Sequence, residues 1–571
     1  MAEQKIIGKG TWIDKLAFEL IEREKQLGRD TDGIIRVESG LGASGIPHIG
    51  SLGDAVRAYG VKLALENLGY KSELIAYSDD LDPLRKIPEG LFLDKKMEKK
   101  WGDEWLYRRV SGIPDPFEEC THGTDGRAHE SYGEHMSGLL LDGLAKLGIK
   151  YVHKRAHDTY KNGILKEQIH KILVNSKKIG DKIEELTGSV IFKNAVPYLP
   201  ECSKCGKIYT TKSYEYIEDE KKVLYRCTDT ERGAYDDKYI LPGCNIEGES
   251  DLTKDFGKLA WKVEFAARWQ AFDIRFEAYG KDIMDSVKVN DWISDEILGF
   301  PHPHHVQYEM FLDKDGKKIS KSLGNVVTSE KWLNYGTPES ILLLLYKRIT
   351  GARELGFEDI PALMDEYNEL EDIYFGKIKV DNEAKLVKSK GLYEYVNLLR
   401  PPENPSTHVS YRLFIQLWKM FKHKPERIVP RLIDYGTIKE TNSHVEELKK
   451  LTGSYFHDFE EKKIPGTDIP LAEVFGMDQK HNDALGQLAG TLSKNEKIED
   501  LQNVIYNIAK ENQIQPKSFF YTLYLVILGV RRGPKLGPLI EDIGIKEVAN
   551  IINDSVKRFQ KEIDKGKQDD L

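Results

Sequence analysis

The sequence has few cysteines and no long apolar run. Only five cysteines occur in 571 residues, too few for a disulfide framework in a chain of this length. The longest apolar runs, 341–346 and 523–530, are far shorter than the roughly 20 residues that span a bilayer. The N-terminus lacks the apolar segment and small-residue cleavage site of a signal peptide. These absences predict a cytoplasmic protein with no membrane partner.

The chain also lacks an excess of positive charge. Lys and Arg number 84 against 93 Asp and Glu, for a net charge of −9. This balance disfavours non-specific coating of nucleic acid, so DNA is not expected as a partner, whereas a tRNA needs only a local basic surface. The length exceeds what one hydrophobic core usually supports, so two to four domains are expected.

Strand and helix patterns alternate from the N-terminus. An amphipathic helix is predicted over 12–24, and an apolar strand over 34–37 leads through a glycine-rich loop, 38–51, into a helix over 55–68. A second strand, 72–76, is followed by three acids: Asp79, Asp80 and Asp82. Because open parallel sheets bind ligands at the carboxyl ends of their strands, these acids are site candidates in a predicted α/β nucleotide-binding fold.

Four glycines and one histidine mark the loop between the first strand and its helix. The glycines let the backbone approach a ligand closely; they are Gly40, Gly42, Gly45 and Gly50. His48 lies at the mouth of the following helix, where anions bind, and its imidazole can hydrogen-bond phosphate oxygens as charge develops. Taken alone, the loop also fits an ordinary turn with a surface histidine.

A second loop, 316–325, is rich in glycine and lysine and contains Lys318-Ile319-Ser320-Lys321-Ser322. Its lysines can follow a pyrophosphate leaving group as point charges. Alone, such a loop is equally a solvated basic turn. The glycine-rich loop precedes the lysine-rich loop, and each lies next to sequence that alternates between strand and helix patterns. Two unrelated turns would rarely produce this arrangement.

The pair resembles the His-Ile-Gly-His and Lys-Met-Ser-Lys-Ser motifs of class I aminoacyl-tRNA synthetases, with Ser51 at the second His and Ile319 at the Met. Further pieces, in order along essentially the whole chain, are most similar to class I lysine-tRNA ligases: 38–40, 79–86, 114–117, 131–135, 261–264, 267–269, 280–282 and 532–537. The chain departs from that family at Gly42, where Thr is frequent, and at Ile283, where His is frequent.

The resemblance implies a Rossmann-like class I catalytic domain with inserted zinc-containing modules, followed by an α-helical anticodon-binding domain. The first catalytic half, with a Cys/His-rich insertion, is expected over 1–192, and a zinc-ribbon-like insertion over 193–249. The second catalytic half is expected over 250–349, and the helical domain over 350–571.

Four of the five cysteines fall in one segment: Cys202, Cys205, Cys227 and Cys244. Four thiolates can hold a structural Zn²⁺ in tetrahedral coordination, with buried free thiols as the alternative. A looser cluster of one Cys, three His and one Asp lies between 115 and 135. The resemblance favours four of these residues as a second zinc site: Asp115, Cys120, His129 and His135.

The resemblance also implies a two-step reaction. The carboxylate of L-lysine attacks the α-phosphate of ATP, with Mg²⁺ bridging the phosphates, and tRNA(Lys) then takes the lysyl group from the adenylate. The expected catalytic residues are His48, Lys318 and Lys321. The expected ATP contacts are Gly45, His48, Gly50, Lys318, Ser320 and Lys321. The expected amino-acid contacts are Gly40, Asp79, Trp261 and Glu264, since an indole can wall an alkyl chain and a carboxylate can hold an ammonium.

Two alternatives remain open. A class I synthetase for glutamate, cysteine or arginine would use the same phosphate motifs. A non-catalytic, zinc-containing RNA-binding paralogue is suggested by Ser51, although Lys318 and Lys321 argue against it.

Overall fold

The computed structural model divides the chain into two compact units. The first comprises Met1–Trp332, Pro338–Phe357 and Lys379–Pro401, and the second Leu333–Thr337, Glu358–Ile378 and Pro402–Leu571. The structure describes residues 6–88, 95–117, 129–232, 239–309, 311–314, 316, 327–351, 353–421, 424–461, 479–495, 498–529 and 533–569. Among them, no helix combines the length and the apolar character needed to cross a membrane.

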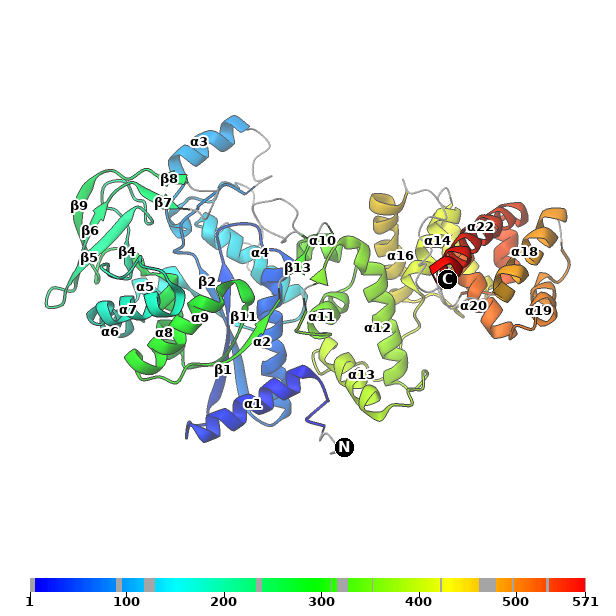
Figure 1. The fold of residues 1–571 in the computed structure, drawn as a ribbon, viewed down its shortest axis with the longest axis horizontal. Helices are drawn as coiled ribbons and strands as arrows, with labels where there is room; N and C mark the ends of the chain where they lie inside the picture. Colours follow the sequence, from blue (N-terminus) through cyan, green and yellow to red (C-terminus); the bar gives the residue numbers. More distant parts are fainter. Residues whose placement is uncertain are drawn as a thin grey trace. The chain divides into compact units, whose positions relative to one another are not determined.

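A five-stranded parallel sheet forms the centre of the first unit (Figure 1). Its strands, in spatial order, are β12 (His304–Tyr308), β11 (Ile274–Gly280), β1 (Ile34–Gly42), β2 (Lys71–Asp79) and β3 (Val152–Arg155). All four pairings are parallel. The strand order reverses between β1 and β11, and open α/β sheets bind ligands at such a reversal. The predicted α/β fold is confirmed.

Two helices next to the sheet show how the local sequence sets the elements. Helix α1 (Trp12–Gln26) begins with a capping box, in which the Asp14 amide donates to Thr11 Oγ1 over 3.4 Å and the Thr11 amide donates to Asp14 Oδ2 over 3.0 Å. Helix α2 (Ile49–Asn67) packs on α1, β1 and β2, and its apolar residues are buried around most of its circumference. Such a helix belongs to a core rather than to a surface.

Two predicted boundaries in this region are wrong. Residues 38–42, predicted as loop, belong to β1, because the ladder with β2 continues to the pair Gly42 and Asp79. Helix α2 begins at Ile49, six residues before the predicted start. In both places tertiary pairing and capping outweigh the low regular-structure propensity of glycine.

Further α-helices belong to the first unit (Figure 1). They are α3 (Lys95–Trp105), α4 (Tyr132–Lys146), α5 (Ala156–Lys161), α6 (Lys166–Val174), α7 (Ser176–Thr187), α8 (Trp261–Phe272), α9 (Met284–Ile293), α10 (Ser329–Leu333), α11 (Pro338–Tyr346) and α13 (Glu383–Val396). The segment 101–135 combines Cys, His, Asp and Gly residues, a composition that predicts irregular structure, but the end of α3 and the start of α4 lie in it. A short parallel pair, β13 (Phe311–Leu312) and β14 (Arg353–Glu354), is also present.

Short antiparallel strands between α7 and α8 form the predicted β-rich segment. Strands β5 (Thr211–Ile217), β6 (Lys222–Cys227) and β9 (Ile246–Asp251) make one sheet. Two further pairs are β4 (Tyr198–Pro200) with β10 (Gly257–Leu259), and β7 (Thr230–Arg232) with β8 (Tyr239–Leu241). The chain therefore leaves the core through β4 and returns through β10, side by side.

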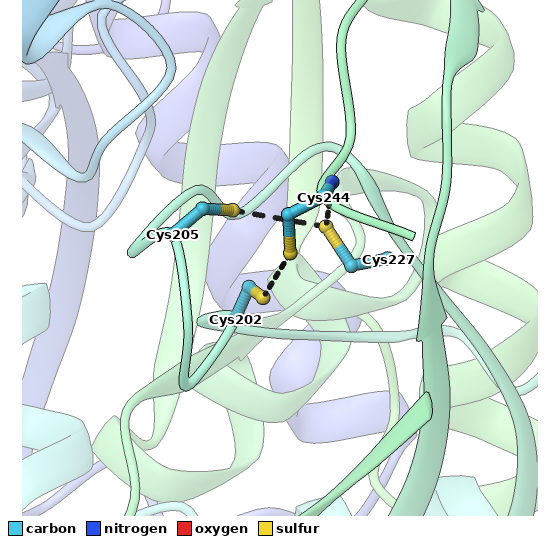
Figure 2. A group of neighbouring side chains, drawn as sticks. All are labelled: Cys202, Cys205, Cys227 and Cys244. Carbon is cyan, nitrogen blue, oxygen red and sulfur yellow. Dashed lines mark hydrogen bonds between the residues drawn. The ribbon is translucent and has the colours of Figure 1, made fainter. Parts of the chain in front are cut away.

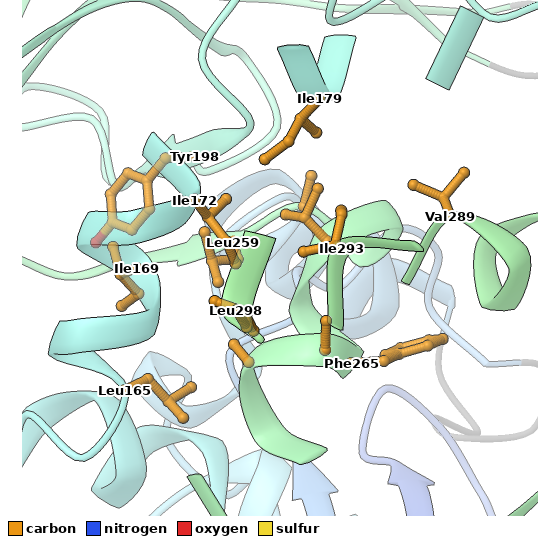
Figure 3. Close-up of a cluster of buried hydrophobic side chains, with 14 of the residues drawn as sticks. Leu165, Ile169, Ile172, Ile179, Tyr198, Leu259, Phe265, Val289, Ile293 and Leu298 are labelled. Carbon is orange, nitrogen blue, oxygen red and sulfur yellow. The ribbon is translucent and has the colours of Figure 1, made fainter. Parts of the chain in front are cut away.

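A hydrophobic cluster joins this strand pair to the helices (Figure 3). Leu165, Ile169 and Ile172, from α6 and the residue before it, are spaced three and four apart and so share one helical face. That face is buried in one cluster with Tyr198 of β4 and Leu259 of β10. The cluster fixes the exit and return of the β-rich segment against the catalytic core.

The described part of the second unit is helical. Its helices are α12 (Ile360–Tyr374), α14 (Tyr411–Phe421), α15 (Ile428–Asp434), α16 (Ser443–Tyr455), α18 (Gln479–Lys494), α19 (Leu501–Glu511), α20 (Pro516–Leu528), α21 (Leu536–Ile543) and α22 (Ile545–Asp569). The apolar spacing within 411–421 and 519–529 predicts a helix in each segment, and the structure confirms them as α14 and α20. The predicted domain limits at residues 192, 249 and 349 stay predictions.

Candidate active site

His48 caps helix α2 with its side chain. Its backbone is extended, and its Nδ1 accepts from the amides of Gly50 (3.0 Å) and Ser51 (3.3 Å). Because Nδ1 accepts, the hydrogen of the neutral ring lies on Nε2. A Cβ at position 50 would lie 2.7 Å from the His48 ring, so the cap requires a glycine there. The motif thus fixes an imidazole N–H donor at a helix N-terminus.

The start of α2 meets the segment that follows the lysine-rich loop. The Ile49 amide donates to the Val327 carbonyl over 2.8 Å. Lys318, Ser320 and Lys321 themselves lie outside the described residues. The hydrogen bond shows that the fold brings Val327, two residues beyond the lysine-rich loop 316–325, to the start of α2, within the first motif.

A pocket of about 160 Å³ opens beside His48. It is lined by His48, Gly50, Ser51, Asp54, Arg57, Gly280, Asp282, Tyr308, Glu309 and Phe311. Arg57 is buried, and its guanidinium carbon lies 4.2 Å from the centre of the Tyr308 ring. Tyr308 in turn donates a hydrogen bond to Asp54. Of the predicted ATP contacts, His48 and Gly50 line this pocket, whereas the buried Gly45 does not.

Two of the predicted amino-acid contacts, Asp79 and Glu264, meet around Lys258, and a third, Trp261, contacts Asp79. Lys258 Nζ lies 2.9 Å from both carboxylate oxygens of Asp79, 2.7 Å from Asp82 and 3.2 Å from Glu264. The Lys258 side chain is 1% exposed. The Trp261 indole donates to Asp79 Oδ2 over 3.1 Å. No periodicity or motif marks Lys258, since its partners Asp79 and Asp82 lie 179 and 176 residues away.

Lys258, Asp79, Asp82 and Glu264 form a buried group, the lysine cage. Burial and the contact with Lys258 shift the pKa values of its acids. Burial raises the pKa of Glu264 to about 7. Burial alone would also raise the pKa of Asp79, but the contact with Lys258 outweighs it and holds that pKa below its ordinary value. Asp79 is therefore the carboxylate of the cage that stays ionised most readily.

A second buried ion cluster involves Glu38 and Glu277, which lie opposite each other in the middle of β1 and β11. Arg268 Nε is 3.0 Å from Glu38 Oε1, and Arg268 Nη2 is 3.7 Å from Glu277 Oε1. Within the part of the chain that the structure describes, neither carboxylate oxygen of Glu38 accepts a well-aligned hydrogen bond, so Glu38 depends on the ion pair with Arg268. Burial, which Arg268 offsets only in part, raises the pKa of Glu38 to about 8. Gly40, the fourth predicted amino-acid contact, lies two residues after Glu38 on β1. A Cβ added at Gly40 would lie 4.0 Å from Arg268 Nη2.

The four cysteines come together (Figure 2). Their Sγ atoms all lie within 4.8 Å of one another, with Cys202 and Cys244 separated by 3.5 Å and Cys205 and Cys227 by 3.7 Å. A tetrahedral thiolate site with metal–sulfur bonds of about 2.3 Å has sulfur–sulfur edges of about 3.8 Å. The donor set and its spacing therefore fit a bound metal ion and exclude disulfides, whose S–S bonds are about 2.05 Å.

The second predicted cluster is described only in part. His135 Nδ1 lies 2.9 Å from Asp115 Oδ2, and the rings of His129 and His135 are 5.2 Å apart. Cys120 lies outside the described residues. Within the part of the chain that the structure describes, the four-cysteine group is the one whose ligand atoms are spaced for a metal.

Comparison with known proteins decides the family. Residues 10–398 match the family model described as "tRNA synthetases class I (K)". The chain belongs to the class I lysyl-tRNA synthetase family. A lysine–tRNA ligase of Cenarchaeum symbiosum is 54% identical over 96% of this chain and 99% of that protein. One of Rickettsia akari is 29% identical over 95% of this chain and 97% of that protein.

Among solved structures, a glutamate tRNA ligase from Elizabethkingia meningosepticum in complex with its amino acid aligns over 92% of this synthetase and 99% of that chain. The identity is 14% and the TM-score 0.33.

The substitution Glu38→Gln is expected to flatten the pH dependence of the synthetase's stability. The pKa of Glu38 is about 8 in the folded protein, against an ordinary value of 4.5. Between these values the folded state keeps a proton that the unfolded state has lost, so wild-type stability falls as pH rises through this window. Urea unfolding from about pH 5 to about pH 8 measures the slope.

The control is Glu22→Gln, which changes an exposed carboxylate on α1. It should leave the wild-type slope unchanged. If Glu38→Gln and the wild type lose stability equally steeply with pH, Glu38 does not hold the proton.

Proposed function

We propose that this protein attaches L-lysine to tRNA(Lys) through a lysyl-adenylate formed from ATP. The observation that carries the proposal is the 54% identity to a lysine–tRNA ligase over 96% of the chain. No comparable observation favours a synthetase for glutamate, cysteine or arginine, or a non-catalytic paralogue. The reaction belongs in the cytoplasm, where ribosomes use charged tRNA.

The pocket beside His48 is the proposed ATP site. His48 Nε2–H and the N-terminus of α2 stabilise the phosphates, and Gly45 and Gly50 let the nucleotide approach the backbone. Lys318 and Lys321 act as point charges on the leaving pyrophosphate, and Ser320 helps to hold their loop closed. Mg²⁺ bound with ATP supplies further charge neutralisation. The contact between Ile49 and Val327 supports this assignment, because Ile49 directly follows His48 and Val327 lies two residues beyond the lysine-rich loop.

The carboxyl ends of β1 and β2, with the start of α8, form the proposed amino-acid site. Trp261 is 38% exposed and offers a free aromatic face to the alkyl chain of lysine. Gly40 leaves room on β1, where, among the described residues, an added Cβ would meet only Arg268 Nη2, at 4.0 Å. Asp79 and Glu264 give this region its negative charge, although their closest cation in the structure is Lys258.

The remaining assignments are the metals and the anticodon. We assign Zn²⁺ to the four-cysteine site and a second Zn²⁺ to Asp115, Cys120, His129 and His135. The second, helical unit is the proposed anticodon reader. The sulfur spacing supports the first metal, and the contact of Asp115 with His135 supports the second.

Purified protein, ATP and total tRNA should give lysyl-tRNA and no other aminoacyl-tRNA. Pyrophosphate exchange with each amino acid in turn, in the presence of tRNA, measures the preference directly. Charging of glutamate, cysteine or arginine in place of lysine would refute the proposal, and so would the absence of any charging.

Lys321→Ala should slow adenylate formation by about 100-fold, because the leaving pyrophosphate loses a charge partner. Single-turnover formation of lysyl-adenylate measures the step. The matched control is Lys331→Ala on α10, an exposed residue with the same loss of charge, which should keep the wild-type rate. If Lys321→Ala and the control form the adenylate at equal rates, Lys321 takes no part in adenylate formation.

Cys202→Ser should remove bound zinc, since a tetrahedral site loses one of four thiolates. Metal analysis of purified protein gives the zinc content per chain, and thermal unfolding gives the accompanying loss of stability. Lys204→Ala, in the same loop, is exposed and serves as the control that keeps the metal. Unchanged zinc in Cys202→Ser would refute the site.

A further inference from the structure

We propose that Lys258 is a positioning residue of the amino-acid site, acting through Asp79 on the Trp261 indole. This inference rests on the proposed lysine-charging function. Lys258 lies on β10, outside every motif that identified the family, and it is a buried cation in a site whose substrate is itself a cation. Its role follows from three sets of contacts.

The first set shows that Lys258 does not itself bind substrate. An ammonium has three N–H donors, and Lys258 faces three carboxylates, those of Asp79, Asp82 and Glu264. Its side chain is 1% exposed. All three N–H donors of Lys258 are therefore used within the protein. The carboxylate oxygens that accept from Lys258 face the protein interior.

The second set links Lys258 to the exposed wall of the site. Asp79 receives Lys258 on both oxygens at 2.9 Å, and its Oδ2 also accepts from the Trp261 indole at 3.1 Å. The other side of the indole packs against Phe265, with ring centres 5.8 Å apart. Since Asp79 is fixed by two contacts to a buried ammonium, the plane of its carboxylate is set, and that plane sets the indole.

The third set of contacts shows what the loss of Lys258 would do to the three carboxylates of the cage. Asp79, Asp82 and Glu264 would be three buried carboxylates in contact distance of one vacated point, and like charges in a buried site repel strongly. Arg268, the other buried cation nearby, already pairs with Glu38 and Glu277. Asp79 would then take up a proton or rotate, and the indole would lose its charged acceptor.

The experiment compares Lys258→Met in the wild-type and Trp261→Phe backgrounds. Phe keeps an aromatic face but has no N–H, so it cuts the contact with Asp79. Lys258→Met should raise the KM for lysine about tenfold, the size expected for one charge-assisted hydrogen bond. The kcat and the KM for ATP should stay within about threefold of wild type. In the Trp261→Phe background, the further rise in the lysine KM should be less than about threefold.

Lys262→Met is the matched control, because it makes the same substitution next to Trp261 on a side chain whose ammonium contacts Thr187 over 3.3 Å and not the cage. It should leave the lysine KM unchanged. If Lys258→Met does not fold, Asp79→Ala with Lys258 in place cuts the same link and should show the same dependence on Trp261.

Three results would overturn the proposal. A lower lysine KM in Lys258→Met would mean that Lys258 competes with the substrate for the carboxylates. An equal rise in both backgrounds would mean that Trp261 is not the recipient, and an equal rise in the KM for ATP would mean a general structural defect. If the wild type charges another amino acid, the proposed function fails, but the same comparison with that amino acid still tests the positioning.

Discussion

Burial of charge on the parallel sheet is the constraint on which the catalytic core depends. Glu38 and Glu277 lie in the middle of β1 and β11, Asp79 lies at the end of β2, and all three carboxylates are buried. The cations that compensate them come from elsewhere: Arg268 from α8 and Lys258 from β10. Removing one partner of a buried ion pair costs about 3–5 kcal/mol. Helix α8 and strand β10 therefore have little freedom in how they dock on the sheet.

The same constraint explains how the cysteine module, the segment between β4 and β10 that carries the four cysteines, is attached to the core. Strand β10 returns from the module and carries Lys258 into the cage, while its partner β4 leads out to Cys202. Two further contacts tie the cysteine module to the first catalytic half: Arg85, after β2, donates to the Tyr209 hydroxyl over 2.8 Å, and Arg109 Nε, after α3, lies 2.5 Å from Glu201. A metal ion bound by the four cysteines would thus also help to order β4 and β10, the strand that carries Lys258.

Local patterns in the sequence predicted local structure well. The period of apolar residues located α1, α2 and α14, and strand runs located β1 and β2, because each signal is contained within one element. The histidine at the mouth of α2 was recognisable for the same reason, since a cap lies next to its helix. The boundaries of β1 and α2 were missed because strand pairing and side-chain capping decided them.

Contacts between distant residues set the limit of what could be predicted. The four cysteines are alike and stand in a recognisable order, so their convergence was foreseeable. Asp79 and Glu264 were recognised as acids near a site, yet their partner Lys258 was not, because a lysine in a short strand has no distinguishing neighbour in sequence. Lys258 becomes buried among these carboxylates only when β10 packs in the folded protein, and its sequence neighbours do not indicate that burial.

The order of strands also has a consequence for how the protein is made. Strand β1 lies between β2 and β11, but β1 ends at Gly42 and β11 begins at Ile274. At about 5–20 residues per second, a ribosome needs on the order of ten to fifty seconds to supply the second partner after the first strand has emerged. During that interval the nascent chain carries an unpaired strand edge, which other chains can pair with. Conditions that slow translation lengthen this exposure, so the yield of soluble protein depends on synthesis rate and on chaperones as well as on final stability.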